Sequence, residues 1–316
     1  MATLLMMIGL PASGKSTRAI RLALDFETNA IVSSDDMRKK LYGSEEIQGD
    51  SQYVFQCLYN EIITALNKNH TVIYDATNLT RKNRVAFIEK IKKEYPDIYI
   101  EAELMIEPLS VIFERNKNRS RTVPEDVILR MLKSFDPPCL EEGFSNIIFY
   151  CSSDKASIPT IEELKNFNQD NKYHSLSLGD HILQTAKYCE EHHYGAYVTE
   201  AAKYHDIGKI ITKSFIDGRG NKTEDAHYYG HEHVSAYLYL NYMNNLWIDN
   251  SKLIDGKIKF DWAKYLYISN LIDFHMKPYT SWKQSSKALE RDTKMFGEKF
   301  IKHVNLLHEA DETAKR

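Results

Sequence analysis

The chain of 316 residues has no long apolar run, and no stretch approaches the roughly 20 residues that a membrane helix needs. Its apolar start, MATLLMMIGL, continues directly into a glycine-rich loop and shows no small-residue cleavage site. These absences argue against an integral membrane protein and against a secreted one. We therefore expect a soluble cytoplasmic protein with no membrane partner, and the composition predicts no particular oligomeric state.

Cysteine, glycine and proline are also scarce. The four cysteines form no CxxC pair, which argues against a disulfide framework and against a thiolate zinc site. With 13 glycines and 8 prolines beside 43% hydrophobic and 27% charged residues, the composition is globular rather than disordered or fibrous. The length is enough for two domains of ordinary size, each with its own core.

An excess of basic charge is the third absence. The net charge of −3 excludes a wholly basic surface, so a nucleic-acid partner has to be argued from a local site. Histidine is distributed unevenly, because only His70 of the 12 histidines precedes residue 170. Metal chemistry is therefore expected in the second half of the chain.

The first half alternates short β-branched runs with amphipathic stretches, which is the rhythm of a parallel sheet with crossover helices. Strands are expected at 3–8, 30–34, 71–77, 98–106 and 146–151. Helices are expected at 15–25, 51–68, 80–94, 108–118 and 124–135. We assign residues 1–152 to an α/β domain with a parallel sheet and flanking helices.

The second half has a different periodicity. Residues 153–172 are polar and irregular, and they are predicted to form a linker with one short helix. Residues 173–316 are almost wholly helical in pattern and are assigned to an all-α domain. Helices are expected at 176–192, 196–210, 231–246, 261–276 and 285–313. Residues 214–230 have the glycine and aspartate content of a loop or hairpin.

A phosphate-binding motif follows the first predicted strand. In IGLPASGKST the spacing Gly9-x-x-x-x-Gly14-Lys15-Ser16 lies between a strand and a helix, which is the context of a Walker A loop. The glycines let backbone N–H groups face the phosphates, Lys15 reaches the β/γ oxygens and Ser16 can ligate Mg²⁺. The sequence therefore predicts that ATP or another nucleoside triphosphate binds here with Mg²⁺.

The acceptor side of this site is expected at the ends of the next strands. Asp35 and Arg38 follow the second strand, at the edge of the sheet where open α/β folds bind ligands. A carboxylate there can take the proton of an acceptor hydroxyl, and an arginine can hold a phosphate. The structural alternative is that Asp35 or Asp36 caps the following helix. Asp75 ends the third strand and suits the water shell of Mg²⁺.

A basic run lies between two predicted helices and contains Arg115, Lys117, Arg119 and Arg121. Such a run is usually a solvated face. P-loop kinases, however, carry a mobile lid at this place, and its arginines neutralise the charge of the transferred phosphoryl group. We therefore favour a functional role for Arg119, and for Arg115 beside it.

With these motifs, residues 1–135 resemble the kinase domain of bacteriophage-type polynucleotide 5′-kinases, which transfer the γ-phosphate of ATP to a 5′-hydroxyl end. The resemblance rests on IGLPASGKST, SSDDMRKKLYG, YDATNLTRKNR and ERNKNRSRTVPEDVILRMLKSF. It implies that Asp35 is the general base, that Arg38 binds a 3′-phosphate and that Arg119 is the lid arginine. It also implies a nucleotide-binding loop made of Gly9, Ser13, Gly14, Lys15, Ser16 and Thr17.

The second half contains the pair His205-Asp206 in KYHDIGK, which alone would be weak evidence for a site. Further candidate ligands lie on successive predicted helices. The full set is His181, His205, Asp206, His231, His275 and Asp311. Imidazoles mixed with carboxylates suit one or two divalent transition ions such as Mn²⁺, Fe²⁺, Co²⁺ or Ni²⁺.

This pattern resembles the HD phosphohydrolase superfamily over residues 173–316. His181, His205, Asp206 and Asp311 match its H…HD…D signature, and His231 and His275 match the histidines that hold a second metal in some members. The resemblance implies hydrolysis of a phosphomonoester or phosphodiester. Asp206 would bridge the two ions.

The remaining residues near this signature have smaller expected roles. Lys209, one turn beyond His205, is placed to bind a substrate phosphate. His174 and His233 are expected either to contact substrate or to support the ligands. The histidines expected to be surface or packing residues are His192, His193, His303 and His308. The aromatic residues of 237–247 are expected to lie in the core.

Three functions remain open. The first is an end-healing enzyme for RNA or DNA, in which the kinase adds a 5′-phosphate and the HD domain removes a 2′,3′-cyclic, 2′- or 3′-phosphate, preparing ends for a nucleic-acid ligase. The second is a small-molecule or tRNA kinase fused to an HD nucleotidase, which the negative net charge slightly favours. The third is a signalling protein with a non-catalytic nucleotide sensor, which Lys15, Asp35 and the complete set of candidate metal ligands disfavour.

Overall fold

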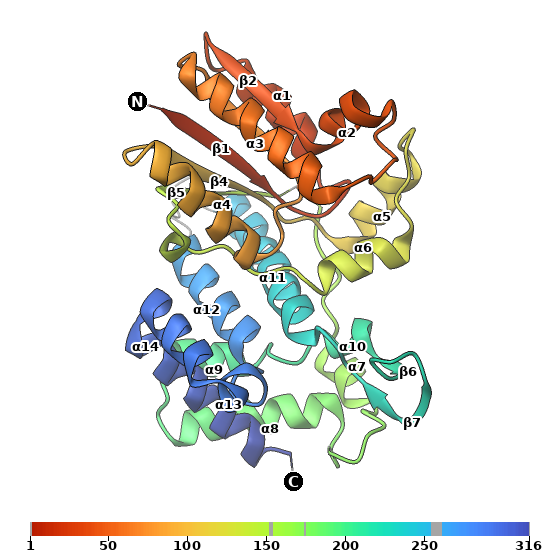
Figure 1. Ribbon diagram of the computed structural model, residues 1–316. Helices are drawn as coiled ribbons and strands as arrows, with labels where there is room; N and C mark the ends of the chain where they lie inside the picture. Colours follow the sequence, from red (N-terminus) through yellow and green to blue (C-terminus); the bar gives the residue numbers. More distant parts are fainter. Residues whose placement is uncertain (1, 152–153, 174, 254–260, 316) are drawn as a thin grey trace. The chain divides into compact units, whose positions relative to one another are not determined.

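The computed structural model describes residues 2–151, 154–173, 175–253 and 261–315 (Figure 1). The chain divides into two compact units. Unit 1 consists of Met1–Ile128 and Pro138–Ser152, and unit 2 consists of Leu129–Pro137 and Ser153–Arg316. Within the described residues, no helix combines the length and the apolar character needed to cross a lipid bilayer.

Unit 1 is built on a five-stranded sheet in the order β2-β3-β1-β4-β5, and all neighbouring strands are parallel. The strands are β1 (Thr3–Ile8), β2 (Asn29–Ser33), β3 (Thr71–Asp75), β4 (Tyr99–Met105) and β5 (Asn146–Tyr150). The predicted α/β fold is confirmed. Because β1 has β3 on one side and β4 on the other, its carboxyl end lies at the switch point where open α/β sheets bind ligands.

Five helices of the first half follow the predicted segments within a few residues, whereas the helix Ser34–Tyr42 and the 3₁₀ turn Leu140–Glu142 lie outside those segments. These elements are α1 (Lys15–Ala23), α2 (Ser34–Tyr42), α3 (Ser51–Asn67), α4 (Arg81–Glu94), α5 (Leu109–Lys117), α6 (Glu125–Leu132) and the 3₁₀ turn η1 (Leu140–Glu142). Leu5, Met7 and Ile73 of the sheet pack against Ala19 and Leu22 of α1. Each large aliphatic side chain buried in this way contributes about 1.5–3 kcal/mol. This packing fixes α1, and therefore the loop before it, at the end of β1.

A buried ion pair joins α4 to η1. Arg84 donates from Nε and Nη2 to the two carboxylate oxygens of Glu142, at 2.6 and 2.7 Å. Both side chains are fully buried. The carboxylate of Glu142 also accepts a hydrogen bond from the backbone N–H of Cys139 at 3.2 Å. The pair closes the turn that leads into β5.

We expect Arg84→Ala to lower the free energy of unfolding by about 3–5 kcal/mol, because it removes the bidentate cationic partner of the buried Glu142 carboxylate. Denaturant titration would measure the change. The matched control is Lys40→Ala, which breaks the exposed pair with Glu61 and should leave stability nearly unchanged. Equal effects of the two substitutions would contradict the structural role assigned to the buried pair.

Within its described residues, unit 2 is helical apart from one antiparallel hairpin, β6 (Ser214–Ile216) and β7 (Lys222–His227), which lies in the segment where a loop or hairpin was expected. Its helices are α7 (Ile161–Lys165), α8 (Leu178–Glu191), α9 (Ala196–Ala202), α10 (Lys209–Thr212), α11 (His231–Leu253), α12 (Trp262–Phe274), α13 (Ser281–Gln284) and α14 (Ser286–Thr313). The short helix α7 lies in the predicted linker. Tyr237, Tyr239 and Tyr242 of α11 are buried, as expected for core residues, whereas Trp247 is exposed, which contradicts the expectation for this residue.

One helix prediction in unit 2 is wrong. The expected helix over 196–210 stops at Ala202, and residues 203–208 form turns before α10 begins at Lys209. The cause is the close packing of Gly208 on the start of α11: a Cβ there would lie 2.4 Å from the carbonyl oxygen of His231. The N–H of Gly208 instead donates to Ser235 Oγ at 2.8 Å. His205-Asp206 therefore lies in a turn rather than in a helix.

Candidate active sites

The glycine-rich loop of unit 1 connects β1 to α1 and has the backbone of a phosphate cradle. Gly9, Ala12 and Gly14 have positive φ angles of 157°, 62° and 93°. A Cβ on Gly9 would lie 2.8 Å from the carbonyl oxygen of Met105, so this position admits only glycine without rearrangement. Gly14 caps α1 without a side chain, and the first N–H groups of that helix remain available to an anion.

Lys15 is the charged centre of this loop. Its ammonium donates to the carbonyl of Leu10 at 2.7 Å and is almost fully buried. Burial lowers the pKa of Lys15 to about 8, against the opposing effect of the Asp75 carboxylate. Burial also raises the pKa of Asp75, and a hydrogen bond with Ser16 partly offsets this. Lys15, Ser16 and Asp75 are thus brought together as the sequence predicts.

The acceptor residues lie at the start of α2, close enough for Asp35 to act electrostatically on Lys15. The capping alternative for Asp35 and Asp36 is wrong, because Ser33 caps α2 by accepting their backbone N–H groups at 3.2 and 3.4 Å. The Asp35 side chain instead contacts two arginines. Arg38 Nη1 lies 3.0 Å from Asp35 Oδ1, and Arg121 Nη1 lies 3.2 Å from Asp35 Oδ2.

The arginines of the basic run between α5 and α6 differ in the groups that they contact. Arg119 is exposed and acts electrostatically on Lys15. Arg115 pairs with Glu107 at 3.3 Å, and its Nη1 lies 3.8 Å from the position of a Cβ on Gly14. Arg121 is the residue that sequence reasoning passed over, because four cations at similar spacing gave no reason to choose it. Its contact with Asp35 makes it part of the candidate acceptor site.

In unit 2, the six predicted metal ligands converge and all are buried. Two groups share Asp206: His181, His205, Asp206 and Asp311 form one, and Asp206, His231 and His275 form the other. Asp206 Oδ2 lies 3.2 Å from His181 Nε2, and Asp206 Oδ1 lies 3.1 Å from His231 Nε2. The two oxygens of one carboxylate therefore face the two groups.

Backbone carbonyls hold all four imidazoles in the same way. The carbonyl oxygens of Ala314, Ala202, Tyr228 and Ile272 lie 3.2, 2.8, 2.8 and 2.7 Å from Nδ1 of His181, His205, His231 and His275, respectively. An Nδ1–H that donates to a carbonyl leaves Nε2 as a lone pair. All four Nε2 atoms point into the cluster. A histidine with its proton on Nδ1 presents the lone pair of Nε2, which is the form that binds a metal ion.

The cluster combines two buried carboxylates, Asp206 and Asp311, with its four imidazoles. Asp311 Oδ1 is buried and makes no hydrogen bond to a described residue, although His181 Nε2 lies 3.0 Å from it. Burial lowers the pKa of His205, but Asp206 outweighs this and raises the pKa to about 10. Burial opposes ionisation of Asp206, yet Lys209 and His205 hold its pKa well below the usual range. A divalent transition ion fits this set of nitrogen and oxygen donors, and it would balance the negative charge of the two carboxylates.

Of the three further predicted residues, the structure describes Lys209 and His233. Lys209 begins α10, is buried and lies 2.7 Å from Asp206 Oδ2. His174 lies outside the described residues. His233 is held by Asp273 at 2.7 Å, with Asp136 at 3.6 Å, and the Asp273 carboxylate raises the pKa of His233 to about 9 against the effect of burial.

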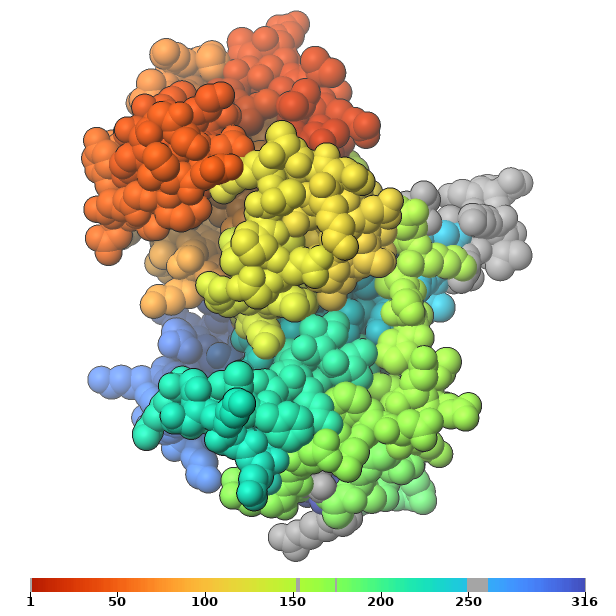
Figure 2. All heavy atoms as spheres, turned by 90° about the vertical axis from the view of Figure 1, so that its right-hand side faces the viewer, coloured from red at the N-terminus to blue at the C-terminus, as the bar shows by residue number. Residues whose placement is uncertain are grey.

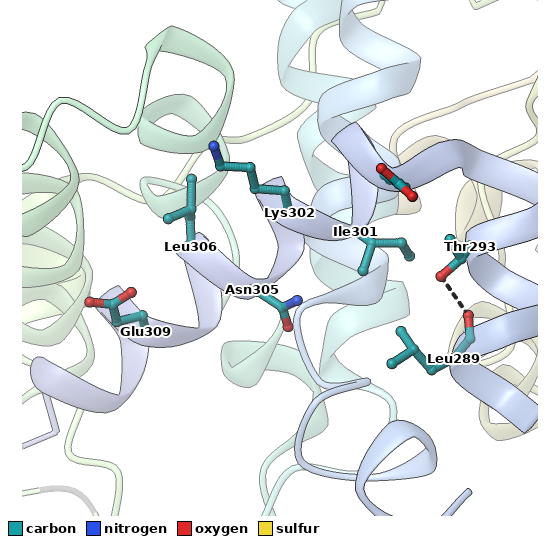
Figure 3. A pocket seen from close by; sticks show the side chains of 8 residues that line it. Leu289, Thr293, Ile301, Lys302, Asn305, Leu306 and Glu309 are labelled. Atoms are coloured by element: carbon teal, nitrogen blue, oxygen red, sulfur yellow. Dashed lines mark hydrogen bonds between the residues drawn. The ribbon is translucent and has the colours of Figure 1, made fainter. Parts of the chain in front are cut away.

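The hollows of unit 2 lie apart from these ligands. One of about 430 Å³ is lined by residues of α14 on both sides of its kink at Gly297, among them Leu289 and Ile301 (Figure 3). Another of about 640 Å³ is lined by residues of α8, α9 and α11 and by residues that follow α8 and α9, among them His193 and Lys203. Neither is lined by any of the six candidate metal ligands.

The match to a family model lies in the first half of the chain. Residues 4–138 match the family model described as an AAA domain, and unit 1 has the parallel-sheet fold of a P-loop kinase domain. A curated relative, the L-seryl-tRNA(Sec) kinase of Methanococcus maripaludis, is 29% identical over 148 residues, which are 43% of this chain and 53% of the relative. The chain thus spans about half the length of that relative.

Solved structures are similar over part of the chain. One belongs to a Pnkp1/Rnl/Hen1 RNA repair complex, with 21% identity, a TM-score of 0.35 and coverage of 41% of this chain and 42% of that one. A fungal RNA kinase has 16% identity, a TM-score of 0.38 and coverage of 51% and 80%. TM-scores this low carry no weight for function.

Proposed function

We propose that the chain is a bifunctional enzyme that heals nucleic-acid ends, with RNA as the favoured substrate. Unit 1 transfers the γ-phosphate of ATP to a 5′-hydroxyl, and an HD-type site in unit 2 removes a 2′,3′-cyclic, 2′- or 3′-phosphate. A nucleic-acid ligase acting downstream is the expected partner. The observation that carries the proposal is one chain with two sites, a P-loop beside Asp35 and Arg38, and a buried His/Asp cluster around Asp206.

In the kinase reaction, Lys15 and the N–H groups of the loop hold the phosphates of ATP, and Ser16 and Asp75 would hold Mg²⁺. Asp35 accepts the proton of the attacking hydroxyl. Arg38 binds the phosphate next to that hydroxyl on the acceptor, which is why an acceptor carrying a phosphate is favoured over a bare nucleoside. Arg119, within electrostatic reach of Lys15, adds positive charge where the phosphoryl group is transferred.

In the hydrolase, divalent ions would lower the pKa of water and stabilise negative charge on the phosphoryl group. One ion would be held by His181, His205, Asp206 and Asp311, and a second by Asp206, His231 and His275. The chain itself keeps every ring in one tautomer through backbone carbonyls and excludes bulk water by burial. Lys209 binds an oxygen of the substrate phosphate next to Asp206.

A second candidate is a tRNA or small-molecule kinase fused to an HD nucleotidase, and the similarity to a seryl-tRNA kinase favours it. The two candidates are separated by supplying γ-labelled ATP with 5′-hydroxyl oligonucleotides, nucleosides and seryl-tRNA. Our proposal predicts label on the oligonucleotide 5′ end. Label on seryl-tRNA or nucleosides, with none on any oligonucleotide, would favour the second candidate and exclude end healing.

Arg38→Ala should raise the KM for a 5′-hydroxyl oligonucleotide about 10- to 100-fold, because one charge-assisted contact to the acceptor phosphate is lost. The KM for ATP should stay the same. Steady-state kinetics with each substrate varied in turn would measure both values.

The matched control is Lys39→Ala, which removes an exposed cation from the next position of α2. It should change neither KM by more than about twofold, as expected for a solvated charge. If both substitutions weaken the acceptor equally, the effect is general electrostatics and Arg38 has no specific role.

A further inference from the structure

The Lys209 ammonium contacts one negatively charged side chain and one neutral side chain. It lies 2.7 Å from Asp206 Oδ2 and donates to Gln169 Oε1 at 2.9 Å. The ring of Tyr228 lies 5.4 Å from the same nitrogen. A lysine has four rotatable side-chain bonds, so an ammonium buried in one orientation needs such partners to stay there.

Gln169 comes from the segment that the sequence assigns to the linker, yet it is fully buried. Its side-chain Nε2 donates to the carbonyl of Leu176 at 3.3 Å, and its backbone carbonyl accepts from the hydroxyl of Tyr228. With Nε2 bound to Leu176 and Oε1 bound to Lys209, both ends of the side-chain amide are engaged.

The neighbours of Gln169 tie the same segment to the hairpin. The N–H of Ala226 in β7 donates to the carbonyl of Asp170 at 2.8 Å, and Lys213 contacts Asp170 Oδ2 at 2.7 Å. In Figure 2 the hairpin faces the viewer in blue-green, beside the light green segment that contains α7 and α8. These contacts hold the segment around Gln169 next to the hairpin and to Lys209.

We propose that Gln169 is a positioning residue that aims the Lys209 ammonium at the phosphate group of the substrate. Asp206 cannot do this alone, because both of its oxygens face candidate metal ligands. A glutamine can, because its neutral amide oxygen orients the ammonium without neutralising its charge. This inference rests on the proposed hydrolase, and it makes the predicted linker part of that site.

The test uses the full chain loaded with Mn²⁺ and inorganic phosphate as the probe, with binding measured by calorimetry. Gln169→Met should raise the Kd for phosphate about 5- to 10-fold, because one hydrogen bond to a charged group is lost. The bound Mn²⁺ per chain and the kinase activity of unit 1 should not change. Gln184→Met, an exposed glutamine of α8, is the matched control and should bind phosphate like the wild type.

A second variant controls for misfolding of Gln169→Met. Gln169→Asn keeps a buried amide but is one methylene shorter, so its oxygen withdraws from Lys209, and it should weaken phosphate binding by a similar factor. In a Lys209→Ala background, adding Gln169→Met should cause no further loss, because Gln169 acts through Lys209.

The outcomes distinguish a failure of the role of Gln169 from a failure of the proposed hydrolase. Wild-type phosphate affinity in Gln169→Met and Gln169→Asn, or a full additional loss in the Lys209→Ala background, would overturn the role of Gln169 while the hydrolase stands. A wild-type chain that binds neither Mn²⁺ nor phosphate would overturn the hydrolase itself, and this inference with it.

Discussion

Asp206→Ala should reduce phosphatase activity at least about 100-fold and remove bound transition metal, while leaving the kinase intact. The reason is that Asp206 is the one residue shared by both ligand groups, with one oxygen facing each. Its loss also removes the carboxylate partner of Lys209 and of the surrounding imidazoles. Metal per chain is measured by mass spectrometry and activity with 2′,3′-cyclic and 3′-phosphate oligonucleotides.

The control for this variant is Glu191→Gln, which removes an exposed carboxylate at the end of α8. It should keep both metal and activity. Full phosphatase activity in Asp206→Ala would contradict the assignment of the cluster. Loss of the kinase together with the phosphatase would contradict the independence of the two sites.

The second large effect is expected in unit 1. Asp35→Ala should lower kcat of the kinase by about 10²- to 10⁴-fold, which is the usual contribution of a general base. The geometry supports this choice, because Ser33 caps the helix and leaves the Asp35 carboxylate to Arg38 and Arg121. The Kd for ATP should change little, since Lys15 and the loop amides bind the phosphates.

Asp36→Ala is a stringent control, because Asp36 follows Asp35 in the same first helical turn but is exposed. Its kinase activity should stay within about twofold of the wild type, as for other exposed surface changes. Phosphatase activity should be unaffected in both variants. Equal losses in Asp35→Ala and Asp36→Ala would mean that helix electrostatics, rather than a specific base, explains the effect.

The fold of unit 1 could be predicted because its signals are local. An apolar run followed by Gly9, Gly14 and Lys15 specifies a strand, a loop and a helix in that order. The strand order was not predicted, because it depends on which hydrophobic faces pack together over long sequence separations. The same limit explains Arg121: spacing along the chain did not distinguish it from Arg119, and only the folded loop brings it to Asp35.

In unit 2, the residues of the cluster were predicted better than their local structure. Ligand chemistry selected His181, His231, His275 and Asp311, and the fold brings them together. The helix through His205 was wrong because helical periodicity does not register the tight contact of Gly208 with α11. Gln169 was missed because a polar, irregular segment gives no sign that one of its residues is buried against Lys209.

The most direct test of two sites acting on nucleic-acid ends uses one oligoribonucleotide with a 5′-hydroxyl and a 2′,3′-cyclic phosphate. The full chain is supplied with ATP, Mg²⁺ and Mn²⁺, and both ends are analysed by mass spectrometry. We expect a 5′-phosphate and loss of the cyclic phosphate, with Asp35→Ala blocking only the first change and Asp206→Ala only the second. An oligonucleotide left unchanged at both ends, under conditions in which the chain phosphorylates seryl-tRNA or a nucleoside, would contradict the proposal.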